Sequence, residues 1–376
     1  RRSRTVSTSL TSKIRGFNVR SRQSWSEGLN TNTANADNDP RNRFFARDRE
    51  SERWNLSGSV DGRLAESLTG SARLSWATTD ERRLPVAQLT GGTYRDPTDD
   101  REDQDLQVGG SLDWQFGDGN QLQASGSTRM NRVDNPGASE QDRDSYNQVA
   151  SLTFRGKREG SMRYDVSLSS SRAHRVNLDA TRSADNQRSS ELRLSTSTSY
   201  ERLAAQISHN FEISARRTIF DFDRSVNTKT INRRSNIRRG WSMRHTVRRS
   251  LFETLQLNST YAFSADDFGT LLVGDGSQIV EEDNNDHRFS LAMNYRPSSA
   301  LGCGVRYSYR LDRQWGFFYA RDSVDRELSF RNAHRNIALN MEYKPTGYTG
   351  FQARVSRSQQ RSGTFDDLSL SLSRTF

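Results

Sequence analysis

The last nine residues of the chain constrain its fold more than any other stretch. They read Leu-Ser-Leu-Ser-Leu-Ser-Arg-Thr-Phe over residues 368–376, so apolar and polar side chains alternate. A β-strand with this period of two has one apolar face and one polar face. A solvated edge strand that is so apolar on one face would invite aggregation, so it must be paired or covered. Closing this strand against the first strand of a barrel would remove both edges.

The apolar positions of this stretch are Leu368, Leu370, Leu372 and the terminal Phe376. A last strand of this kind resembles the C-terminal assembly signal of the Gram-negative outer-membrane β-barrel (porin-like) superfamily. The resemblance covers the last strand specifically and identifies no single member. It implies an all-β, antiparallel transmembrane barrel in the bacterial outer membrane, inserted by the outer-membrane assembly machinery.

The composition fits a membrane barrel better than a soluble globule. Of the 376 residues only 32% are hydrophobic, the formal net charge is +10 and the mean hydropathy is -0.92. A soluble protein of this length needs a large apolar core, and this content would ordinarily indicate disorder. In a membrane barrel, lipid solvates one face of each strand and water solvates the other, so half of each strand can be polar.

Targeting signals and cysteine content constrain the fold only slightly. No run of about 18 apolar residues is present, so no transmembrane helix is expected. The sequence shows neither an initiator Met nor a secretory signal, as a mature cleaved protein or a fragment would. Cys303 is the single cysteine, so no intrachain disulfide can form.

Pairs of alternating segments recur along the chain. In the clearest, residues 54–64 and 68–76 each alternate and are joined by a short turn, which predicts a β-hairpin. Long polar segments separate these hairpins, as in a barrel with short periplasmic turns and long extracellular loops. An aromatic patch, 315–319, falls in one of these expected loops.

Two strands per long loop give about 16 strands of about nine to eleven residues, each able to cross a bilayer at a tilt. Residues 1–16 are expected to be an N-terminal tail or a partial strand, and residues 17–376 the barrel. If an upstream strand is missing, the alternative count is 18, because bacterial single-chain barrels have even counts.

Aromatic residues at strand ends are expected to form the membrane-interface girdles of the barrel. The candidates are Trp54, Trp76, Trp114, Trp241, Tyr295 and Tyr343.

The sequence contains no catalytic, metal or cofactor signature, and we expect no enzymatic activity and no cofactor. His209, His245 and Ser259 fall on the apolar side of their strands, but no third group is in place to orient them. A basic stretch, 233–249, runs through a predicted strand and does not indicate nucleic-acid binding.

The polar face of the predicted strands carries an excess of arginine, which would give a water-filled lumen a positive potential. Guanidinium groups also suit planar carboxylates and phosphates. The alternative is that these charges form cross-strand ion pairs with inward acids, which would set the barrel shape without selectivity. The lumen-lining candidates are Arg63, Arg73, Arg129, Arg163, Arg193, Arg244, Arg288, Arg306, Arg310 and Arg354.

These observations predict a porin-like channel for polar solutes, preferentially anionic ones. Two alternatives remain open: an exopolysaccharide-export barrel, and a structural sheath around a partner such as a multihaem cytochrome. The expected partners are the lipid bilayer, lipopolysaccharide, the assembly machinery, and a second copy or a periplasmic or lumenal protein.

Overall fold

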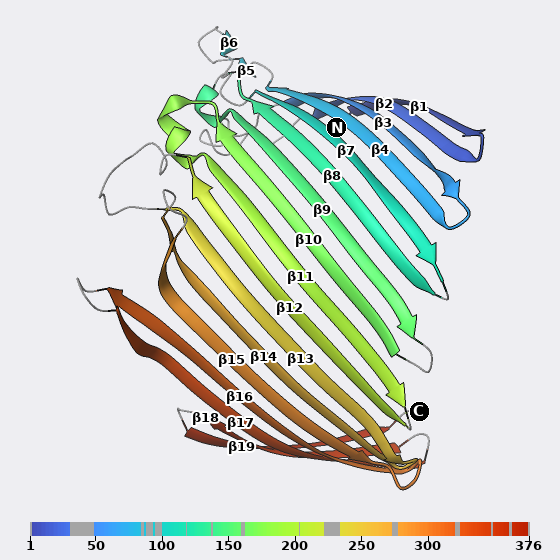
Figure 1. The fold of residues 1–376 in the computed structure, drawn as a ribbon, viewed down its shortest axis with the longest axis vertical. Coiled ribbons are helices and arrows are strands. Elements are labelled where there is room, and N and C mark those ends of the chain that lie inside the picture. The colour runs from blue at the N-terminus through green and yellow to red at the C-terminus, as the bar shows by residue number, and fades with distance from the viewer. Residues whose placement is uncertain are drawn as a thin grey trace.

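The computed structural model describes residues 2–30, 49–83, 86–87, 93–94, 100–117, 119–136, 138–158, 162–202, 204–221, 234–272, 277–319, 324–346, 349–360 and 363–374. In this part of the chain, one antiparallel sheet of 17 strands dominates (Figure 1). Each strand pairs with the strands of this sheet that precede and follow it along the chain, so the first and the last strand have one partner each. The fold is therefore the all-β antiparallel meander that the alternating sequence predicts.

The strand bounds follow the alternating segments. The strands of the large sheet are β1 (Arg2–Ile14), β2 (Phe17–Asn30), β3 (Arg49–Ala65), β4 (Leu68–Arg83), β7 (Arg101–Phe116), β8 (Asn120–Asp134), β9 (Arg143–Arg158), β10 (Met162–Asn177), β11 (Gln187–Arg202), β12 (Ala205–Phe220), β13 (Asn236–Phe252), β14 (Leu255–Leu271), β15 (Gln278–Tyr295), β16 (Leu301–Tyr319), β17 (Val324–Thr346), β18 (Thr349–Gln360) and β19 (Gly363–Arg374). Two short strands, β5 (Val86–Ala87) and β6 (Thr93–Tyr94), form a separate ribbon.

Side chains alternate between the two faces of this sheet as the sequence predicts. Leu56 lies opposite Trp76, Val60 opposite Ala72, and the intervening serines and arginines face the other way. In β19, Leu368, Leu370 and Leu372 lie opposite Val355, Ala353 and Phe351 of β18, on the same apolar face. Phe376, the last residue of the expected assembly signal, lies outside the described residues.

The N-terminal segment is a full strand of the sheet. β1 pairs with β2 over its whole length, from Arg2 opposite Leu29 to Ile14 opposite Phe17. The turn between them places Arg15 at φ 49° and Gly16 at φ 89°. A two-residue turn with both residues at positive φ matches the twist of a hairpin, and glycine adopts this conformation without strain. With β1, the sheet has one strand more than sixteen.

The strands are also longer than expected, and much of the polar sequence assigned to loops is strand. β14 extends to Leu271 and β15 begins at Gln278, inside a segment expected to be irregular. The aromatic patch at 315–319 is likewise part of β16. These extensions alternate poorly in hydropathy because water solvates both of their faces. A polar strand outside the bilayer therefore has the composition of a loop.

Two of the connections contain short helical turns, η3 (Ser139–Gln141) and η4 (Ala180–Asp185). The carboxylate of Asp179 accepts hydrogen bonds from the hydroxyl and the amide of Thr181, which lower the pKa of Asp179. Within the described residues, no helix is both long and apolar enough to cross a membrane.

The sheet is open, which differs from the closure that the apolar last strand predicts. β19 pairs with β18 and β1 with β2, but no pairing joins β1 to β19 among the described residues. Figure 1 shows the two edge strands at opposite ends of the sheet. In an antiparallel meander of 17 strands the first and last strands run in the same direction, so they could only pair in parallel.

We expect cysteines placed on the two edges not to form a disulfide. In a Cys303→Ser background, Ser7→Cys combined with Ser371→Cys should stay reduced under mild oxidation in lipid. The positive control is Ser7→Cys with Ser24→Cys, because these residues face each other between β1 and β2. A mass shift on non-reducing gels measures the outcome. An efficient bond between positions 7 and 371 would show instead that the sheet closes directly, with parallel edge strands.

Candidate functional site

The strand register gathers the arginines of the polar face on one side of the sheet. Arg73, for example, lies opposite Ser59 of β3 and Gly109 of β7, and Arg244 lies opposite Asn210 and Ala262. Following the register from strand to strand, all the lumen-lining candidates fall on this face. The polar face of a membrane barrel is the face that water solvates.

Four of these ten arginines are paired with nearby carboxylates. Arg129 donates two hydrogen bonds to Asp105, at 2.8 and 2.9 Å, in the bidentate geometry that suits a guanidinium. Arg310 lies 3.0 Å from Asp312 and 3.3 Å from Asp286. Two further candidates also pair with carboxylates: Arg193 with Glu191 and Glu212, and Arg288 with Asp286. For these four arginines the ion-pair alternative describes the geometry. Arg63 instead donates to the backbone carbonyl of Glu66, which leaves its charge uncompensated.

The other candidates make no ion pair with any described residue. They are Arg63, Arg73, Arg163, Arg244, Arg306 and Arg354. Some acids of the same face are already held by other cations: Asp165 lies 2.8 Å from Arg155, and Glu342 lies 2.6 Å from Lys344. These six arginines of the polar face therefore have no paired carboxylate among the described residues.

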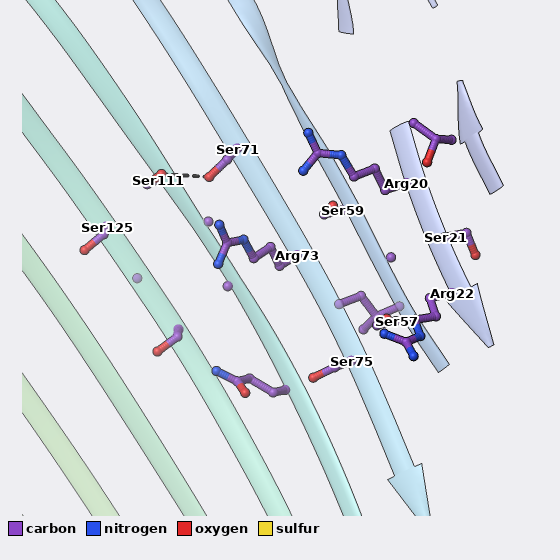
Figure 2. A pocket seen from close by; sticks show the side chains of 18 of the residues that line it. Arg20, Ser21, Arg22, Ser57, Ser59, Ser71, Arg73, Ser75, Ser111 and Ser125 are labelled. Carbon is purple, nitrogen blue, oxygen red and sulfur yellow. Dashed lines mark hydrogen bonds between the residues drawn. The ribbon is translucent and has the colours of Figure 1, made fainter. Parts of the chain in front are cut away.

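One hollow on the polar face concentrates this charge. It has a volume of about 770 Å³ and lies over β1–β4 and β7–β9 (Figure 2). Arg20, Arg22 and Arg73 line it, and no Asp or Glu does. The rest of the polar-face lining is mainly hydroxyl-bearing: Ser9, Thr11, Ser57, Ser59, Ser71, Ser75, Ser111, Ser125 and Ser127. We call this site the serine–arginine hollow.

The register fixes the spacing of the three guanidinium groups. Arg20 lies opposite Ser59, which in turn lies opposite Arg73. The two arginines thus flank one serine across two strand spacings, about 10 Å at the backbone. Arg22 lies two residues along β2, on the same face and opposite Ser57. Figure 2 shows these side chains with the serines between them.

The positive charges of the three arginines are little compensated by nearby carboxylates. Arg20 approaches Asp61 only to 3.9 Å, and Asp61 also accepts a hydrogen bond of 2.9 Å from Asn18. Arg22 and Arg73 have no ion pair with a described residue. Small side chains around them leave the floor of the hollow open, so the guanidinium groups remain accessible to a solute.

Of these three arginines, only Arg73 is among the lumen-lining candidates predicted from the sequence. Arg20 and Arg22 lie in a segment whose alternation is weak, so the sequence pattern alone does not assign them to a face. The signal was nevertheless present, because Phe17, Val19 and Trp25 alternate and lie opposite Gly62, Val60 and Trp54. That register places the even-numbered residues of β2, including both arginines, on the polar face.

Most of the candidate interface aromatics divide between the two ends of the strands. Trp54 and Trp241 lie toward the ends that lead into the long connections, Trp76 lies midway along β4, and Trp114, Tyr295 and Tyr343 lie near the short turns. Trp25 joins the first group: its ring lies 6.2 Å from that of Trp54. The indole nitrogens of both donate to Glu52, at 2.8 and 2.9 Å.

Near the short turns, aromatic rings form a row across neighbouring strands. Trp114 contacts Phe116 at 4.7 Å, Phe116 stacks on Phe154 at 5.9 Å, and Phe154 contacts Tyr164 at 5.4 Å between ring centroids. Two aromatic belts that flank an apolar band are the arrangement of a transmembrane barrel.

The outward histidines lie together on the apolar face. His209 and His245 face each other across β12 and β13, with their Nδ1 atoms 2.9 Å apart. Ser259 lies diagonal to His245, because His245 pairs with Tyr261. Among the described residues, no three or more His, Cys, Asp or Glu side chains are grouped to hold a metal ion.

Comparison with known proteins gives structural likeness only. No protein-family model and no curated protein sequence matches the chain. Among solved structures, the FrpB iron transporter from Neisseria meningitidis aligns with a TM-score of 0.51 and 9% identity, over 100% of this chain and 64% of that one. The alcaligin outer membrane receptor FauA from Bordetella pertussis aligns with a TM-score of 0.47 and 10% identity, over 97% of this chain and 62% of that one.

The chain spans roughly three-fifths of the length of these structures. The likeness to FrpB shows the fold, and it agrees with the register, the apolar face and the aromatic belts. The protein has the fold of the bacterial outer-membrane β-barrels, which agrees with the bacterial outer membrane as its location.

Proposed function

We propose that the protein is a non-enzymatic channel of the outer membrane that favours anionic polar solutes. The observation that supports this most is the serine–arginine hollow, where Arg20, Arg22 and Arg73 gather on the polar face with no acid in the lining. Uncompensated guanidinium groups over a low-dielectric wall raise the local concentration of anions. FrpB, which shares the fold, is an iron transporter, and this is consistent with a transport role.

A second hollow on the same face shows why the charge balance matters. It has a volume of about 480 Å³ and carries Arg244 and Arg288, but Asp165, Glu212 and Asp286 also line it. Its mixed charges would favour neither sign of ion. The proposed selectivity therefore depends on the N-terminal wall of the sheet rather than on the total number of lumenal arginines.

The test is the reversal potential of the purified chain in a planar bilayer under a KCl gradient. We expect a potential of the sign that chloride preference gives. Arg22→Gln with Arg73→Gln should move it clearly toward zero, because two uncompensated charges are removed.

The matched control is Arg129→Gln with Asp105→Asn. This variant removes one arginine together with its bidentate partner and leaves the net lumenal charge unchanged. Its reversal potential should stay close to that of the unmodified protein. A cation-preferring potential in the unmodified protein would overturn the proposal.

A further inference from the structure

The hydroxyl lining of the serine–arginine hollow points to a more specific ligand, an inference that rests on the proposed channel function. Simple anion attraction needs guanidinium groups alone. Here the arginines are embedded in serines contributed by β1, β3, β4, β7 and β8. A serine hydroxyl can both donate and accept a hydrogen bond, so it complements the alcohol groups of a solute.

Most of these hydroxyls are free to bind. Ser71 and Ser111 bond each other at 2.7 Å, and Ser125 bonds Ser151 at 2.7 Å. The remaining ones have no side-chain hydrogen bond to a described residue: Ser9, Thr11, Ser57, Ser59, Ser75 and Ser127. Ser59 lies opposite both Arg20 and Arg73, Ser57 lies opposite Arg22, and Ser75 lies opposite Ser57.

The rest of the lining limits the ligand class. No aromatic side chain lines the hollow, so it offers no ring on which the apolar face of a neutral sugar could stack. No carboxylate is present to repel an acid. A volume of about 770 Å³ accommodates a small polar solute with room for water.

We propose that the serine–arginine hollow binds a polyhydroxylated carboxylate, a sugar acid, with Arg20, Arg22 and Arg73 on the carboxylate and the neighbouring serines on the hydroxyls. The guanidinium fork matches a planar carboxylate with two parallel hydrogen bonds. The serines of β3 and β4 then face the polyol chain or ring edge. Each half of the ligand meets a group of the matching chemistry.

Block of the KCl current through the full chain in a planar bilayer tests this inference, with gluconate as the probe. Propionate carries the carboxylate without hydroxyls, glucose carries hydroxyls without the charge, and inorganic phosphate is an oxyanion without a polyol. We expect gluconate to block in a saturable manner, at a concentration roughly tenfold or more below that needed for the others, because several hydrogen bonds separate the probes.

Two sets of variants separate the hydroxyl part from the charge part. Ser57→Ala, Ser59→Ala and Ser75→Ala together should raise the half-blocking concentration of gluconate by roughly tenfold, through the lost hydrogen bonds. The same triple variant should leave the reversal potential unchanged. Ser290→Ala, Ser308→Ala and Ser356→Ala together form the matched control, because these serines share the polar face but lie outside the hollow.

The outcomes distinguish failure of this inference from failure of the proposed channel. Equal block by gluconate, propionate and phosphate, with chloride preference intact, would overturn the sugar-acid site and leave the anion channel standing. The same holds if both triple-serine variants weaken block equally. Cation preference of the unmodified protein would overturn the channel itself. Heat-modified migration on gels confirms that each variant is folded before it is measured.

Discussion

Replacement of Leu152 by arginine should destabilise the folded protein by about 2–4 kcal/mol in a bilayer, because arginine on a lipid-facing strand position near the midplane costs about this much. Leu152 lies midway along β9, opposite Leu168 and Ala124 on the apolar face, with 44% of its surface exposed. In water this exposure would be a liability, but in lipid it is the contact that holds the strand in place. The free energy of unfolding in liposomes, from a denaturant titration followed by tryptophan fluorescence, measures the effect.

The adjacent residue provides the matched control. Ser151 precedes Leu152 in the same strand but faces the opposite side, between Ser125 and Ser169. Ser151→Arg introduces the same side chain into the water-filled side, so it should cost at most the hydrogen bond that Ser151 shares with Ser125, about 1 kcal/mol. If the two variants lost equal stability, or if Ser151→Arg lost more, the assignment of the faces would be wrong.

The assignment of faces was the part of the fold that the sequence could predict. Alternation is a local property, so 54–64 and 68–76 show their apolar side without any knowledge of the neighbouring strands. The hairpin register then follows from the short turns, and Leu56 meets Trp76 as the pattern requires. The same reasoning placed Arg73 on the polar face before any contact was known.

The extent of the strands and the state of the sheet edges could not be predicted in this way. Beyond the bilayer both faces of a strand are wet, so the extension of β16 through residues 315–319 looks like a loop in composition. There, Arg326 covers the ring of Trp315 at 4.3 Å and pairs with Asp283, contacts that depend on the neighbouring strands. Closure depends on the total number of strands, which no local pattern contains.

The candidate site was predictable only in part for the same reason. Arg22 stands out because no Asp or Glu lines the hollow around it, and a single segment of sequence cannot show that. Sequence reasoning counted inward arginines, whereas the structure shows that Arg129 is neutralised and Arg73 is not. What distinguishes the hollow is its number of arginines without a paired carboxylate, rather than the total number of arginines on the polar face.

Gly269→Ala should disrupt the far end of the β14–β15 hairpin, because the added methyl group would meet backbone rather than side chain. The register of β14 and β15 shifts between Phe268 and Gly269, which marks a β-bulge. A Cβ atom at position 269 would collide with the carbonyl group of Ile279 and lie 2.8 Å from the Cα atom of Val280. Backbone cannot rotate away, so we expect a loss of about 1–3 kcal/mol, as for other overpacked sites.

Two further glycines show whether the loss comes from this collision. At Gly126 a Cβ atom would have its nearest neighbour at 3.8 Å, so Gly126→Ala should be neutral or slightly stabilising. At Gly156 the collision is with the ring of Tyr164, which can turn, so Gly156→Ala should cost less than Gly269→Ala and be rescued by Tyr164→Ala. Amide hydrogen exchange of residues 268–280 measures the local opening free energy. Unchanged protection in Gly269→Ala would mean that the bulge has room for a side chain, and that glycine is not what shapes the hairpin there.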